Sequence, residues 1–74
     1  MNRSIHESMA ICFKENIKIY PIIYDKTTFK IEVNYNGRKK VGEKLYGITS
    51  DQKKMQKRII ELYNEFADKI QSRG

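Results

Sequence analysis

The 74-residue chain has no tryptophan and only one cysteine, one proline and one histidine. A single cysteine excludes an internal disulfide and a cysteine-rich zinc site, and it fits a reducing compartment better than a secreted location. The longest apolar stretches, Met9 to Phe13 and Tyr20 to Tyr24, are too short for a membrane span or a signal-peptide core. The sequence therefore predicts a cytoplasmic protein without a membrane segment.

Signs of catalysis are also scarce. No glycine-rich phosphate loop, carboxylate pair or Ser/His/Asp set is visible. His6 has no metal-ligand cluster near it in sequence, and Cys12 lies on an apolar stripe that favours core packing over nucleophilic chemistry. A chain of this length buries a small core. We expect one domain, residues 1–74, acting as a monomer or weak homodimer, with no enzyme activity, cofactor or metal site.

Charge is distributed unevenly along the chain. Residues 38–58, here called the basic segment, hold eight basic and two acidic residues, whereas the remaining residues carry equal numbers of each sign. The net charge of +6 therefore resides in this segment. Its basic residues are Arg38, Lys39, Lys40, Lys44, Lys53, Lys54, Lys57 and Arg58. Clustered cations on a small domain are typical of a protein that binds a polyanion, because each phosphate contact releases a condensed counterion.

The first half of the chain changes its hydrophobic period once. Ser4 and Glu7 form a capping-box pattern, which predicts a helix over residues 5–15. Apolar residues then alternate from Ile17, and Pro21 favours an edge strand because proline cannot donate to a ladder. The alternation over residues 29–35 is the cleanest in the chain and predicts a central strand.

The second half begins with a hairpin signal. Asn36-Gly37 tolerates positive φ at both positions and leads into a third strand over residues 39–46. Thr49 and Gln52 form a second capping-box pattern, which predicts a helix over residues 50–71. Its apolar stripe consists of Met55, Ile59, Leu62, Phe66 and Ile70. The expected fold is α+β, in the order α-β-β-β-α, with a three-stranded antiparallel meander and both helices on the face of Phe29, Ile31, Val33 and Tyr35.

The start of the second helix has an unusual composition. Lys53, Lys54, Lys57 and Arg58 occupy its first two turns, where cations oppose the helix dipole. A phosphate backbone lying across this end would explain the arrangement. The alternative is a solvated lysine-rich face that keeps a small protein soluble.

The order of elements resembles the double-stranded RNA-binding domain. The similarity rests on an alternating strand that ends at Gly37, on Gly42-Glu43 in the third strand and on lysines at the start of the last helix. Ile5-His6-Glu7 is similar to the family's first-helix stretch. The resemblance implies that Glu7 contacts the RNA minor groove and that the lysines of the last helix hold phosphates across the major groove.

Residues 17–70 also resemble the arm-type DNA-binding domain of tyrosine recombinases and, more loosely, plant-type AP2 domains. That resemblance implies a meander that enters the major groove, with Lys30, Glu32 and Asn34 on base edges and residues 38–40 on the DNA backbone. An ordinary solvated sheet face is the alternative for the first three residues.

The leading hypothesis is a module that grips duplex RNA or DNA. Its expected binding residues are the eight basic residues of the basic segment together with Glu7 and Lys30. The alternative is a small protein-interaction module or phage-like inhibitor that docks the same basic surface on an acidic protein partner.

Overall fold

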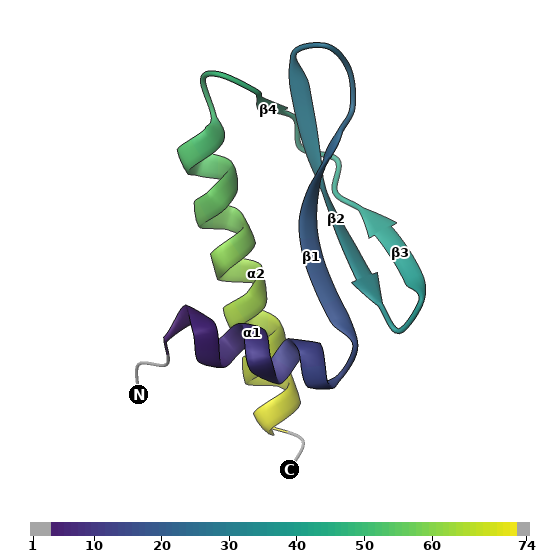
Figure 1. Cartoon of the computed structure of the whole chain (residues 1–74), viewed down its shortest axis with the longest axis vertical. Coiled ribbons are helices and arrows are strands. Elements are labelled where there is room, and N and C mark those ends of the chain that lie inside the picture. The colour runs from purple at the N-terminus through teal and green to yellow at the C-terminus, as the bar shows by residue number, and fades with distance from the viewer. Residues whose placement is uncertain (1–3, 73–74) are drawn as a thin grey trace.

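The computed structural model describes residues 4–72. In chain order the elements are α1 (Ile5–Lys14), β1 (Ile17–Ile23), β2 (Thr28–Tyr35), β3 (Arg38–Val41), β4 (Tyr46–Gly47) and α2 (Gln52–Ser72) (Figure 1). Strands β1, β2 and β3 form an antiparallel meander, and β4 also pairs with β2. The expected α+β class and the order helix, meander, helix are confirmed.

Helix α1 begins where the capping pattern predicted. The Ser4 hydroxyl accepts a hydrogen bond from the Glu7 N–H at 3.2 Å. After the helix, Asn16 adopts a φ of 59°, the left-handed conformation that often ends a helix. The Asn16 carbonyl accepts a hydrogen bond from the Asn36 N–H at 2.9 Å, so the end of α1 is tied to the turn between β2 and β3.

Strand β1 is an edge strand, as Pro21 predicted. On its outer side, the backbone groups of Ile19 are satisfied by the side chain of Tyr63. The Ile19 N–H donates to the Tyr63 hydroxyl at 2.9 Å, and the Ile19 carbonyl accepts from the same hydroxyl at 3.0 Å. Alternate residues of an antiparallel strand direct their backbone groups to the same side. Pro21 therefore faces this outer side too, and its missing N–H removes no bond to β2.

The expected third strand is divided in two. Asn36 and Gly37 have φ values of 52° and 89° and form the predicted hairpin turn. Pairing with β2 runs to Val41, opposite Glu32, and resumes at Tyr46, opposite Phe29. Residues 42–45, here called the bulge, therefore face only two residues of β2. The bulge thus has two residues more than the part of β2 that it faces. Because two is an even number, the alternation of side chains between the two faces continues across the bulge, and Tyr46 still faces the core.

Helix α2 begins at Gln52, slightly later than predicted. The Asp51 carboxylate accepts a hydrogen bond from the Gly47 N–H at 2.8 Å and thereby links the helix start to β4. Thr49 lies too far before the helix to serve as its N-cap, so the predicted capping box with Gln52 is wrong.

The core lies on the predicted face of the sheet, but its centre is displaced toward β1. Helix α2 runs beside β1 and β4, and α1 crosses the C-terminal half of α2 (Figure 1). Tyr35, at the end of the predicted stripe, is 37% exposed. The buried apolar residues are Cys12, Ile17, Ile19, Ile31, Tyr46, Met55, Tyr63 and Ala67. Within residues 4–72, no helix combines the length and apolarity needed to cross a membrane.

Candidate nucleic-acid interface

Strand β3 carries three of the predicted binding residues, all of them exposed. Arg38 and Lys40 pair with Tyr35 and Val33 and so lie on the side of the sheet that the helices occupy, whereas Lys39 lies on the opposite, open face. β3 is displaced from the helices, which leaves both of its faces uncovered (Figure 1).

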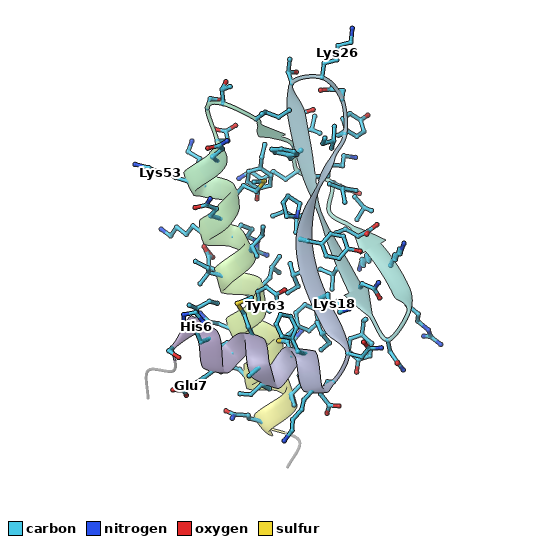
Figure 2. All side chains as sticks on the ribbon, in the orientation of Figure 1. His6, Glu7, Lys18, Lys26, Lys53 and Tyr63 are labelled. Carbon is cyan, nitrogen blue, oxygen red and sulfur yellow. The ribbon has the colours of Figure 1, made fainter. Side chains whose placement is uncertain are left out.

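The four basic residues of α2 follow one another along the helix surface, because residues three and four apart are neighbours there. Lys54 and Arg58 are four residues apart and share one side, and Arg58 faces the bulge. Lys53 and Lys57 are likewise four residues apart, Lys57 lies three residues from Lys54, and Lys53 points away from the sheet (Figure 2). The cations of α2 therefore extend from Arg58 at the bulge to Lys53 on the outer side of the helix, and those of β3 lie on a strand displaced from the helices.

Few acidic groups neutralise these cations. Lys54 lies 4.0 Å from Asp51, and Arg58 lies 3.6 Å from Glu61 and 3.8 Å from Glu65. These exposed, long pairs contribute little energy. Within residues 4–72, the other six basic residues of the basic segment form no ion pair.

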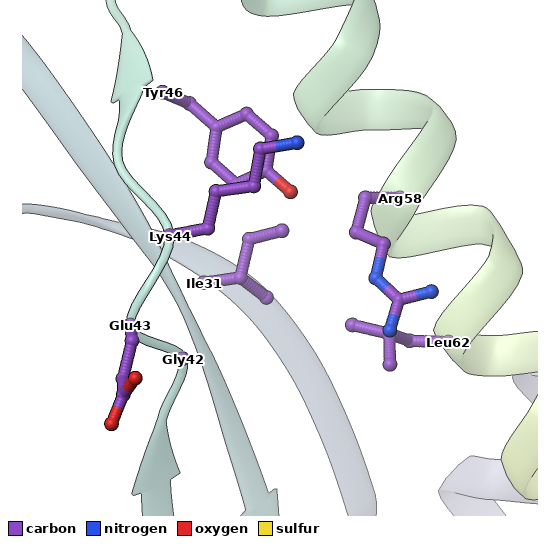
Figure 3. Close-up of a pocket in the computed structure, with 7 residues that line it drawn as sticks. All are labelled: Ile31, Gly42, Glu43, Lys44, Tyr46, Arg58 and Leu62. Atoms are coloured by element: carbon purple, nitrogen blue, oxygen red, sulfur yellow. The ribbon is translucent and has the colours of Figure 1, made fainter.

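A pocket of about 350 Å³ lies between the bulge and α2. It is lined by Ile31 of β2, by Gly42, Glu43, Lys44 and Tyr46 of the following segment, and by Arg58 and Leu62 of α2. Lys44 and Arg58 extend from opposite walls, and Glu43 points away from the other lining side chains (Figure 3). The Lys44 ammonium lies 5.2 Å from the Tyr46 ring centroid, within cation–π range. Two of the predicted binding residues thus meet at one hollow.

The open face of the sheet holds the three residues that the recombinase resemblance placed on base edges. All three are half-buried and have partners within the chain. The Lys30 ammonium lies 4.4 Å from the Tyr24 ring centroid, the Glu32 carboxylate accepts a hydrogen bond from the Tyr20 hydroxyl, and the Asn34 side chain accepts from the Gly37 N–H at 3.1 Å. The bond to Glu32 raises the pKa of Tyr20 above its ordinary value, assisted by burial. These contacts give the face a structural role.

Glu7, the predicted minor-groove contact, lies exposed in the first turn of α1. Its side chain and that of His6 are at the same end of the helix (Figure 2). Lys53 lies at the N-terminal end of α2, whereas α1 crosses the C-terminal half of that helix (Figure 2). Glu7 is not among the residues that line the pocket between the bulge and α2.

Within the described chain, no group of three or more His, Cys, Asp and Glu side chains is placed to hold a metal ion. Cys12 is buried and donates a hydrogen bond to the Tyr63 carbonyl, with the sulfur 3.4 Å from the oxygen. This contact gives the thiol a packing role between α1 and α2.

The pocket was not predicted from the sequence, because residues 39–46 have the pattern of one continuous strand and not of two strands separated by a bulge. Gly42 was the available signal, since glycine within a strand pattern often marks a bulge. The apolar floor from Ile31 and Leu62 could not be assigned to a site, because core positions and pocket floors have the same composition.

No protein-family model matches the sequence, and comparisons with curated proteins and with solved structures find no match.

Proposed function

We propose that this protein binds nucleic acid, duplex RNA or DNA, mainly through the phosphate backbone. The observation that carries the proposal is the set of exposed cations on β3, the bulge and the start of α2, most of which lack an acidic partner within residues 4–72. Such groups can exchange counterions for phosphates without first breaking strong ion pairs.

The start of α2 supports the same proposal. Its first turn contains no acidic residue, although an acid there would stabilise the helix dipole. The lysines at this end therefore do not stabilise the isolated helix. A phosphate near the helix start would be attracted both by these side chains and by the positive end of the dipole.

We place the centre of the proposed phosphate-binding surface at the cations around the pocket. Lys44 lies on the bulge, and Lys54 and Arg58 share one side of α2. Residues 38–40 continue the positive surface along β3. Phosphate contacts position a protein on nucleic acid without reading the base sequence, so we propose binding with little sequence preference. Glu7 would make the minor-groove contact only in the duplex RNA form of the proposal.

Salt dependence of binding tests the proposal directly. Fluorescence anisotropy with a short duplex RNA and a duplex DNA of the same sequence should show affinity that falls steeply with salt concentration. The triple variant Lys44→Gln/Lys54→Gln/Arg58→Gln should bind more weakly, with the logarithmic salt slope reduced by about 0.9 for each lost contact with B-form DNA.

The matched control is Lys14→Gln/Lys26→Gln/Lys69→Gln, which removes the same charge away from the pocket. Equal losses in the two triple variants would show binding by net charge alone and contradict a localised interface. Absence of binding to either duplex at low salt would overturn the proposal.

A second candidate function is binding of an acidic protein segment at β3. This strand lies at the end of the sheet and is paired on one side only, by β2. An extended acidic peptide could add to that edge, with main-chain hydrogen bonds supplying affinity and residues 38–40 supplying charge complementarity. Chemical-shift changes confined to Arg38–Val41 on titration with such a peptide, together with no response to duplexes, would favour this candidate.

A further inference from the structure

We infer that the pocket between the bulge and α2 receives the base of one unpaired nucleotide, a bulged nucleotide in a duplex or one in a single strand. The inference rests on the proposed function and names the feature of the nucleic acid that the site recognises. It is carried by the chemistry of the pocket, in which an apolar floor lies between two cations.

The floor suits the apolar faces of a planar base. Ile31 and Tyr46 are buried core residues whose side chains close the base of the pocket, and the half-buried Leu62 forms the wall on α2. The volume of about 350 Å³ lies near the lower end of the range for small-ligand sites. A base seated there would exclude water from Leu62 without displacing any core residue.

The two cations suit a nucleotide better than other apolar anions. Lys44 and Arg58 reach the pocket from separate walls (Figure 3). A nucleotide within a strand carries one phosphate on its 5′ side and another on its 3′ side, so one base can bring an anion to each wall. The carboxylate at a peptide C-terminus brings only one. Unpaired bases can also stack on an arginine side chain, which Arg58 offers at the rim.

Arg58 is free enough to take this role. Its distances of 3.6 and 3.8 Å to Glu61 and Glu65 exceed those of a good charge-assisted hydrogen bond. The guanidinium group can therefore turn to a phosphate while losing little. Residues 38–40 provide cations for the phosphates that follow along the strand.

Gly42 allows the pocket to be filled without changing any charge. It lines the pocket, and a Cβ added there would meet only the Ile31 carbonyl oxygen, at an ordinary contact distance of 3.5 Å. Gly42→Leu should therefore fold and place its side chain in the space for the base. Gly42→Ala is the matched control because it leaves most of that space open.

The experiment compares three RNA duplexes by fluorescence anisotropy: one fully paired, one with a single bulged nucleotide, and one in which that nucleotide lacks its base. The last two have the same phosphates and differ only in the base. We expect the wild-type protein to bind the base-bearing bulge about tenfold more tightly than the abasic bulge, as stacking of one base provides. Gly42→Ala should keep this preference, and Gly42→Leu should lose it while still binding the paired duplex.

Each other outcome has a distinct meaning. Equal affinity for the base-bearing and abasic bulges, with binding of the paired duplex intact, would overturn this inference and leave the proposed function standing. A preference retained by Gly42→Leu, in a variant that circular dichroism shows to be folded, would place the base elsewhere and also overturn it. No binding of any duplex at low salt would overturn the proposed function, and the inference with it. Chemical-shift changes at Gly42–Tyr46 caused by a peptide with a free C-terminal carboxylate, but not by the bulged RNA, would assign the pocket to a protein partner.

Discussion

At the scale of single residues, Tyr63 joins the two halves of the molecule. Its hydroxyl is both donor and acceptor to the backbone of Ile19, and it is 4% exposed. Its ring meets Phe13 of α1 edge to face, with centroids 5.9 Å apart. One side chain therefore contacts α1 and the outer edge of β1.

Tyr63→Phe should lower the free energy of unfolding by about 1–3 kcal/mol, because both the N–H and the carbonyl of Ile19 would lose their partner in a buried setting. Urea denaturation measures the loss, and hydrogen exchange at the Ile19 amide should become faster. Tyr35→Phe is the control, since Tyr35 is exposed and should change stability little. Similar losses in both variants would contradict the role given to the Tyr63 hydroxyl.

Asp25 organises the loop between β1 and β2. Its carboxylate accepts hydrogen bonds from the Thr28 hydroxyl at 2.7 Å and from the Thr27 and Thr28 N–H groups at 2.9 Å each. The Thr28 hydroxyl is the main reason that the pKa of Asp25 is lower than its ordinary value, and the Thr27 N–H adds to the effect.

This shift predicts a pH-dependent contribution to stability. A carboxylate whose pKa is lower in the folded protein stabilises it above the unfolded-state pKa of about 4, and this contribution disappears as the pH falls through the folded-state value. The stability advantage of wild type over Asp25→Ala should thus be constant near neutral pH and shrink below about pH 4. Denaturation of both proteins from pH 7 to 2 checks this, and a constant difference down to pH 2 would contradict it.

At the scale of elements, α2 has its charges in an unfavourable order. Lysines fill its first turns, and the acids Glu61 and Glu65 follow later. The helix gains stability from its buried side, including Met55 and Tyr63, rather than from its charges.

Reversing one of these charges should therefore stabilise the protein. Lys53→Glu places an acid in the first turn and should raise the free energy of unfolding by about 0.3–1 kcal/mol. Lys69→Glu in the last turn is the opposite control and should lower it. The same Lys53→Glu protein should bind a duplex less tightly. A variant that is stabilised and binds with unchanged affinity would exclude Lys53 from the interface.

The sequence predicted each element to a different accuracy. The alternation from Phe29 to Tyr35 located β2 to within one residue, because each side chain there obeys the two-residue period. The segment after Gly37 contains no such period, so its division into β3, the bulge and β4 had no local signal beyond Gly42. The role of Tyr63 depends on a contact with Ile19, which is distant in sequence, and no local pattern encodes that contact.

For the whole molecule, the sequence predicted the amount of charge better than its placement. A net charge of +6 follows from composition alone. The positions of the charged side chains on β3, at the pocket and on the outer side of α2 are set by two features of the fold. These are the point at which the bulge ends and the side of α2 that packs on the sheet. Those features depend on packing between segments far apart in the chain.

Because the net charge is high and long-range repulsion among the cations is only weakly offset, added salt should stabilise the folded protein. Raising the salt concentration from about 10 mM to about 150 mM shortens the Debye length from roughly 30 to 8 Å, so the midpoint of thermal unfolding should rise. Sodium chloride avoids the exclusion effects of sulfate or phosphate. The Lys44→Gln/Lys54→Gln/Arg58→Gln protein should show a smaller rise, and a falling midpoint in wild type would contradict this account.

The two-residue surplus of the bulge sets a rule for changes in chain length at this position. Removing two residues from the segment 42–45 would let β3 and β4 join as one continuous strand, with Tyr46 still directed to the core but without the loop that forms one wall of the pocket. Removing one residue would turn Tyr46 toward solvent or force a new bulge. Insertions and deletions should therefore be tolerated here in pairs, and their first effect should be on the ligand rather than on the fold.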